Sequence, residues 1–247
     1  MNGSACRAFD RDVVGFSLVR AGWDGLVPLD LRYTWTRIFP FKKLSGEVKM
    51  NILDSIKKDF TTVTLVLMPV AIAINIVVGQ IVLILRLPVF LDSIGTVLVA
   101  VVAGPWAGAL TGTLSNVIWG LAIDPNALPW FPVALFIGLV AGICATYGLF
   151  KSWVRVVIAG IILAFTAAVV STPIAVYLFG GITASGISFF TAYFLQTGQD
   201  LITAVLSANF IWEPVDKIAT SLVAYAIIKG LSARYLARFP RAENVSA

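Results

Sequence analysis

The chain has 247 residues, of which 59% are hydrophobic and 13% are charged, and its mean hydropathy is +0.92. Soluble domains are closer to half apolar and a quarter charged, so the composition predicts an integral membrane protein. The net charge is +5, but the basic residues stand beside apolar spans, where anionic lipids attract them. We therefore expect a lipid bilayer as their partner and no nucleic acid. The absence of histidine excludes Ser-His-Asp triads, histidine-ligated zinc and histidine proton relays.

Residues 1–49 differ from the rest of the chain. They are rich in arginine and lysine and contain no apolar run long enough for a signal peptide. From Met50 the sequence reads "MNILDSIKKDF" before a long apolar stretch, as many bacterial membrane proteins begin. Two interpretations stay open: residues 1–49 are translated sequence upstream of a true start at Met50, or they are a cytoplasmic extension. We expect a membrane domain over 50–241 and a short tail over 242–247.

The apolar stretches predict an all-α protein with six membrane-spanning helices. A crossing helix needs about 20 apolar residues, and fewer where the bilayer is shielded. Gly104-Pro105 separates the second helix from the third, because proline fits the first turn of a helix but not its interior. The six helices are expected near 62–85, 91–104, 105–122, 131–150, 154–179 and 214–236.

The segment 187–211 is apolar enough for a seventh crossing, but its centre reads "LQTGQDL". A seventh crossing would place the basic residues that follow it on the outer side, against the positive-inside rule. We therefore predict six spans, both termini in the cytoplasm, and a long outer segment over 180–213 that returns into the bundle as a lid or re-entrant hairpin. The residues assigned to the inner side on this ground are Lys57, Lys58, Lys151, Arg155, Lys229, Arg234, Arg238 and Arg241.

Polar and aromatic residues gather in the predicted outer loops. Aromatic faces with a few directional hydrogen-bonding groups suit a small, planar, polar ligand. An ionisable residue at membrane depth is costly and usually faces a cavity, which makes Asp92 a candidate. As alternatives, the tryptophans belong to an interfacial belt, and Asp124 before Pro125 forms a turn. The candidate substrate-binding residues are Asp92, Asn116, Trp119, Asp124, Asn126, Trp130, Gln196, Gln199, Asp200, Asn209 and Trp212.

Small residues follow a second pattern. The motifs "GALTG" at 108–112 and "GLVAG" at 138–142 are both G-x-x-x-G, which predicts close helix packing within the bundle. In the first helix Ala71, Asn75 and Gly79 are spaced four apart and form a flat stripe. This stripe either packs inside the bundle or docks against another membrane protein.

Motifs of catalysis are absent from the sequence. It has no G-x-x-x-x-G-K-[ST] phosphate loop, no H-E-x-x-H and no G-x-S-x-G. We expect no enzymatic activity, no cofactor and no metal, so ATP hydrolysis would have to come from another subunit. A stand-alone secondary transporter is an alternative, although the chain has no internal repeat, and a membrane ligand sensor is another.

Two stretches carry a resemblance to a known family. They are "FLDSIGTVLVAVVAGPWAGALTGTLSNVIWGL" at 90–121 and "EPVDKIATSLVAYAIIKGL" at 213–231. The sequence resembles the substrate-binding S component of energy-coupling-factor (ECF) vitamin transporters over most of the region after Met50. The resemblance implies a subunit of the cell membrane that captures a vitamin or related micronutrient near the outer face. It also implies a separate transmembrane coupling subunit and a pair of cytoplasmic ATPases as partners.

The family often docks its coupling subunit on an Ala-x-x-x-Ala motif in the first helix. This sequence departs from that motif, because Ala71 is followed by Asn75. The resemblance therefore assigns the docking role to the stripe Ala71, Asn75 and Gly79. The aromatic and amide residues suit a flavin, a thiamine-related pyrimidine, a pterin or a modified nucleobase, and the acids of the outer loops favour a neutral or cationic ligand.

Overall fold

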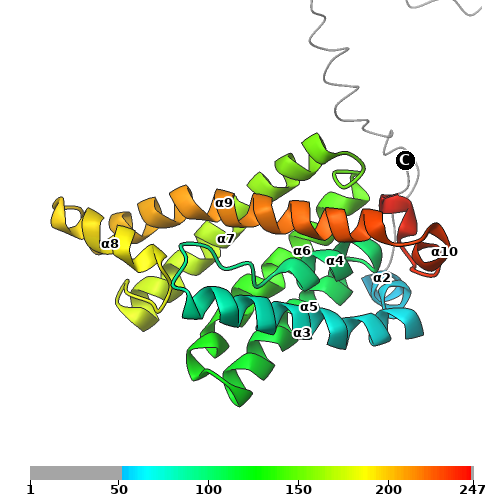
Figure 1. Cartoon of the computed structure of the whole chain (residues 1–247), viewed down its shortest axis with the longest axis horizontal. Helices are drawn as coiled ribbons and strands as arrows, with labels where there is room; N and C mark the ends of the chain where they lie inside the picture. Colours follow the sequence, from blue (N-terminus) through cyan, green and yellow to red (C-terminus); the bar gives the residue numbers. More distant parts are fainter. Residues whose placement is uncertain (1–51, 246–247) are drawn as a thin grey trace, which may run out of the picture. The chain divides into compact units, whose positions relative to one another are not determined.

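The computed structural model describes residues 52–245, and all regular structure in this part of the chain is helical (Figure 1). The predictions for residues 1–49 and for a start at Met50 lie outside the described residues. The elements are α2 (Ile52–Asp59), α3 (Thr62–Ile84), α4 (Ile94–Val102), α5 (Pro105–Ala122), the 3-10 helix η1 (Pro125–Trp130), α6 (Phe131–Thr146), α7 (Trp153–Phe179), α8 (Ile187–Gln196), α9 (Leu201–Gly230), α10 (Ala233–Leu236) and the 3-10 helix η2 (Ala242–Asn244).

The short helix α4 forms the centre of the bundle. All nine of its residues are buried, and it contacts α3, α5, α6 and α9. Its sequence, IGTVLVAVV, is apolar on almost every side, as expected for a helix surrounded by other helices. The chain turns at Gly104, whose φ is 125°, and α5 begins at Pro105 as the sequence predicts.

The two G-x-x-x-G motifs pack against neighbouring backbone inside the bundle, as predicted. A Cβ atom at Gly138 of α6 would come within 2.4 Å of the Ala109 nitrogen on α5. One at Gly142 would come within 2.4 Å of Pro105 Cα, and one at Gly112 within 2.6 Å of the Ala134 carbonyl oxygen. The absence of side chains at these positions lets the α5 and α6 backbones touch.

The stripe on α3 faces the interior of the bundle, which corrects its assignment as a docking surface. Ala71 and Asn75 are each 1% exposed, and Gly79 is also buried. The Asn75 amide nitrogen donates to Thr96 Oγ1 at 2.9 Å and to Ser115 Oγ at 3.0 Å. The single amide of the stripe therefore joins α3 to α4 and α5, and the bundle itself covers the residues expected to meet a partner.

The expected outer segment over 180–213 is shorter in the structure, because α9 begins 13 residues before the predicted start at 214. Asp200 caps this helix: its Oδ2 atom accepts a hydrogen bond from the Thr203 amide at 3.1 Å. This bond and one from the Thr203 hydroxyl lower the pKa of the exposed Asp200 carboxyl. The segment between α7 and α9 is thus confined to 180–200, and about half of it is α8.

The helix α9 has 30 residues, which corresponds to about 45 Å at 1.5 Å per residue. In Figure 1 it runs along the length of the bundle from α8 to α10. Within the described residues, three helical stretches are long and apolar enough to cross a membrane: Thr62–Ile84, Pro125–Thr146 and Trp153–Phe179. The chain is thus a multi-pass membrane protein, and the count of six spans stays a prediction.

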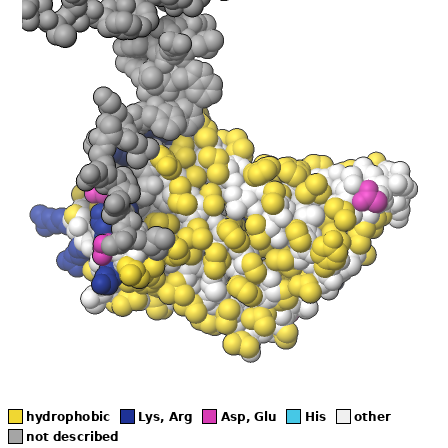
Figure 2. Space-filling view, turned by 180° about the vertical axis from the view of Figure 1, so that it is seen from behind, with side chains coloured by type: hydrophobic (Ala, Val, Ile, Leu, Met, Phe, Trp, Pro, Cys, Tyr) yellow, Lys and Arg dark blue, Asp and Glu magenta, His cyan; other side chains and the backbone are white. Residues whose placement is uncertain are grey.

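The described part of the chain has two chemically different ends. Figure 2 shows basic side chains gathered at one end, hydrophobic side chains over the broad surface beside it, and an acidic group at the far end. Exposed large apolar side chains in the described part of the chain include Val66, Leu121 and Phe165, which are 60–77% exposed. Such exposure is expected where lipid tails, and not water, surround the helices.

The basic end is held together by a buried ion pair. Arg241 Nη2 lies 2.8 Å from Asp59 Oδ1, and the Trp106 amide at the start of α5 donates to Asp59 Oδ2 at 3.1 Å. Burial raises the pKa of the Asp59 carboxyl, although the Arg241 guanidinium opposes this shift. The segment after Arg241, predicted to be a tail, packs on the end of α4, where the Asn244 amide donates to the Val101 carbonyl at 3.0 Å.

Candidate ligand-binding site

A cavity of about 290 Å³ opens at the end of the bundle opposite the Asp59–Arg241 pair. The ends of α3, α5 and α7, the starts of α6 and α8, and the first part and middle of α9 surround it. The loop before α4 and the loop after α7 complete its wall. The cavity therefore lies directly beyond the first residues of the short central helix.

Seven of the eleven predicted substrate-binding residues line this cavity, and four do not. Gln196 ends α8, Gln199 and Asp200 belong to the turn before α9, and all three lie outside the wall. Trp212 also lies outside, where its ring packs on that of Phe190 with centroids 4.8 Å apart. The lining residues are Asp92, Asn116, Trp119, Asp124, Asn126, Trp130 and Asn209.

Aromatic rings form flat apolar parts of the wall. The rings of Trp130 and Phe179 are stacked, with centroids 5.3 Å apart and planes inclined by 10°. The Trp119 indole N–H donates to Gln80 Oε1 at 2.9 Å, which fixes the orientation of that ring. Such surfaces accommodate planar ligands.

Asparagine side chains supply directional polar groups on the wall. Asn209 of α9 uses its amide nitrogen to donate to Ser171 Oγ and Thr172 Oγ1 on α7, both at 3.1 Å. Its Oδ1 atom accepts no hydrogen bond from the described residues. Asn116, which is 7% exposed, makes no side-chain hydrogen bond within this part of the chain. The Asn209 amide oxygen and the Asn116 amide are therefore available to a ligand.

The loop between α7 and α8 adds a cluster of hydroxyl groups. The Thr183 amide donates to Ser188 Oγ at 2.7 Å, and the Thr183 and Ser185 hydroxyl oxygens lie 3.0 Å apart. The Gly186 amide donates to the Leu87 carbonyl at 3.3 Å, which joins this loop to the loop before α4. Two segments far apart in the sequence thus close the same side of the cavity.

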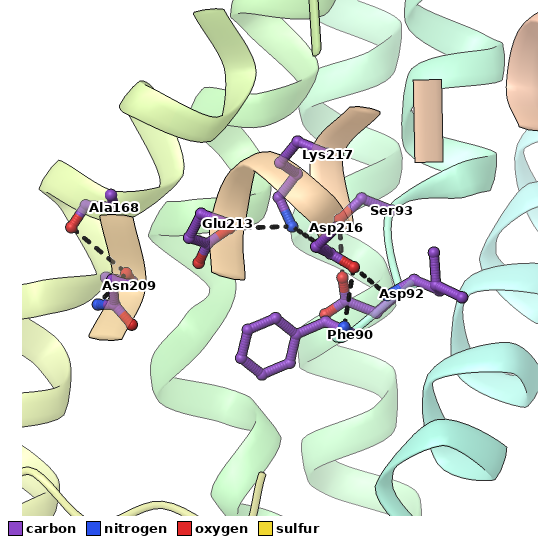
Figure 3. Close-up of polar contacts among 10 residues, drawn as sticks. Phe90, Asp92, Ser93, Ala168, Asn209, Glu213, Asp216 and Lys217 are labelled. Atoms are coloured by element: carbon purple, nitrogen blue, oxygen red, sulfur yellow. Dashed lines mark hydrogen bonds and ion pairs between the residues drawn. The ribbon is translucent and has the colours of Figure 1, made fainter. Parts of the chain in front are cut away.

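The sequence reasoning missed a group of charged residues in the middle of α9. Glu213, Asp216 and Lys217 are spaced so that all three lie on one face of the helix, and each is at most 2% exposed. The Lys217 ammonium contacts Asp216 Oδ2 and lies 3.5 Å from Glu213 Oε2 (Figure 3). Glu213 and Lys217 line the cavity. The motif "EPVDK" was the signal, but the expected outer segment ended at 213 and placed these charges at the membrane surface.

Asp216 also holds the loop before α4. Its Oδ1 atom accepts hydrogen bonds from the Phe90 amide at 2.8 Å and from the Leu91 amide at 2.7 Å (Figure 3). Leu91 has a φ of 51° and Arg86, in the same loop, a φ of 50°, a conformation that costs about 1 kcal/mol or more for a residue with a side chain. The carboxylate of Asp216 offsets this cost and fixes Phe90 in the cavity wall.

A family model described as the substrate-specific component of ECF transporters matches residues 63–228. The chain belongs to this family. The match runs from the start of α3 almost to the end of α9 and includes every residue that lines the cavity. Comparison with curated proteins gave no match, and neither did comparison with solved structures.

Membership confirms the resemblance found in the sequence. An S component is a substrate-binding membrane subunit of a transporter and not an ATPase, and it associates with a membrane coupling subunit and ATPases. The apolar surface of the helices agrees with this assignment.

Proposed function

We propose that this S component captures a small, planar, polar micronutrient, a vitamin or a precursor of one, in the cavity at the end of α4. A separate coupling subunit and a pair of cytoplasmic ATPases would then drive its uptake. The observation that carries the proposal is the combination of flat aromatic walls with polar groups that have no partner within the described residues. Ligand sites are typically apolar clefts with a few such groups, and 290 Å³ is near the lower end of their range of about 300–1,000 Å³.

The charge distribution supports capture at the outer face of the membrane. The exposed lysines and arginines of the basic end, such as Lys57 and Lys151, would face the cytoplasm under the positive-inside rule. The cavity is at the other end and would then open to the outside. The substrate-binding residues that we retain are the seven that line the cavity, together with Glu213 and Lys217.

The test is native mass spectrometry of the purified protein, which would reveal a small molecule that co-purifies with it. Asn209→Ala removes an acceptor from the cavity wall, and we expect it to lower the ligand occupancy roughly tenfold or more, because a ligand donor then loses its partner. Asp200→Asn is the matched control, since Asp200 is exposed and outside the cavity. Equal occupancy in both variants would contradict the assignment of this cavity.

Uptake assays distinguish the proposal from a stand-alone secondary transporter. We expect uptake of the co-purifying compound only when the coupling subunit and ATPases are present together with the S component. Uptake by the S component alone in proteoliposomes, driven by an ion gradient, would favour the secondary transporter.

A further inference from the structure

We propose that the cavity selects a cationic ligand, a planar molecule with an amidinium-like or protonated amino-heterocyclic group that binds at Glu213 and Asp92. This inference rests on the proposed function, because it names the chemical class of the captured substrate.

The charges around the cavity do not balance. Asp92, Glu213 and Asp216 are three carboxylates, and Lys217 is the single basic residue that the structure places among them. Lys217 Nζ is in direct contact with Asp216, so this pair is largely self-neutralising. Asp92 and Glu213 both line the cavity and keep no full counter-charge among the described residues.

Of the two carboxylates, Glu213 is the one with fewer hydrogen bonds from the protein. It is 2% exposed, and its Oε2 atom forms an ion pair with Lys217 Nζ at 3.5 Å but accepts no hydrogen bond from the described residues. Burial of a carboxylate oxygen that accepts no hydrogen bond and shares its one counter-charge is costly in a protein interior, and more so at membrane depth. A donor from the ligand would remove that cost.

Asp92 is better stabilised than Glu213. Its Oδ1 atom accepts a hydrogen bond from the Ser93 hydroxyl at 2.8 Å, and it stands just before the start of α4, where the helix dipole favours a negative charge. Glu213 lies in the middle of α9 and receives no such contribution. The positive group of the ligand is therefore expected to lie closest to Glu213.

The rest of the wall suits the same ligand. Asn209 presents only its oxygen to the cavity, since its amide nitrogen is engaged with two hydroxyl groups. The stacked rings of Trp130 and Phe179 offer a face to a planar cation. A bare metal ion fits less well, because no cluster of three or more metal-ligating side chains occurs in the described part of the chain.

Three probes of nearly the same shape test the proposal: benzamidinium, benzamide and benzoate, which carry a positive, zero and negative charge. Their binding to the purified S component is measured by calorimetric titration. We expect benzamidinium to bind roughly tenfold or more tightly than benzamide, because hydrogen bonds between charged groups are stronger than neutral ones. Benzoate is expected to bind most weakly.

The variants Glu213→Gln and Asp92→Asn keep the side-chain shapes and remove one charge each. We expect Glu213→Gln to abolish most of the preference for benzamidinium over benzamide, and Asp92→Asn to reduce it. Asp200→Asn, outside the cavity, should leave the preference unchanged. Asp92→Asn also supplies the measurement if Glu213→Gln does not fold.

The proposal is overturned if benzoate or benzamide binds as tightly as benzamidinium, if benzamidinium does not bind up to its solubility limit, or if both variants keep the full preference. A neutral or anionic compound found with the purified protein would also overturn it. That last result would leave the proposed function intact, because capture of a ligand in the cavity would still be observed.

Discussion

At the scale of single residues, Asp216 links the charged cluster to the shape of the cavity. One carboxylate oxygen binds the amides of Phe90 and Leu91, and the other contacts Lys217. The residue is completely buried, so neither its charge nor its hydrogen bonds can be replaced by water. The loop before α4 and the position of the lysine therefore depend on the same side chain.

We predict that Asp216→Asn lowers the free energy of unfolding by about 3 kcal/mol, because it removes one partner of a buried ion pair and weakens the charge-assisted hydrogen bonds from the Phe90 and Leu91 amides. Thermal unfolding of the purified protein in detergent measures this effect as a lower Tm. Asp200→Asn, an exposed change of the same kind, should shift the Tm little. A Tm of Asp216→Asn equal to that of the native protein would show that the ion pair contributes little to stability.

At the scale of helices, glycines set the distance between α5 and α6. We predict that Gly138→Ala is destabilising by about 1–3 kcal/mol, because the added methyl group meets the α5 backbone and overpacks the contact. Gly230→Ala, the same substitution at the end of α9, meets no atom within 4 Å. It should be neutral or slightly stabilising. Equal Tm values for the two variants, measured by thermal unfolding, would contradict close packing of α5 on α6.

The helix bounds predicted from the sequence were accurate for some helices and wrong for others. The Gly104-Pro105 break and the helix α3 were predicted closely, because proline geometry and long apolar runs are local signals. The start of α9 was misplaced because its first half carries polar residues such as Asn209 and Glu213. In a linear sequence these indicate an exposed loop, whereas in the bundle they face a cavity or a polar partner.

The difference between local signals and contacts made only in the folded bundle also explains which residue positions were predicted correctly and which were not. Residues such as Trp119 and Asn126 stand at helix ends, and helix ends gather on one side of a bundle, so their position near the cavity followed from the span assignment. The inward direction of Asn75 depends on hydroxyl groups of Thr96 and Ser115, which only the three-dimensional structure brings together.

At the scale of the whole molecule, the described chain has a basic end and a cavity end. We predict that a cysteine at the exposed position Asp200 reacts with a membrane-impermeant maleimide in intact cells. A cysteine at the exposed position Lys57 should react only after the cells are permeabilised. Both variants are made in a chain in which Cys6 and Cys144 are replaced by alanine. The opposite labelling pattern would place the cavity on the cytoplasmic side and contradict uptake.

The brevity of α4 has a consequence for ligand size. Its nine residues extend over about 14 Å, which is less than half the hydrocarbon thickness of a bilayer. The cavity lies at the N-terminal end of this helix, beside Asp92 and Ser93. The short helix leaves room for the chamber, and the loop before it closes part of the wall. One additional turn before Ile94 would fill the chamber, and one fewer would make room for a larger molecule.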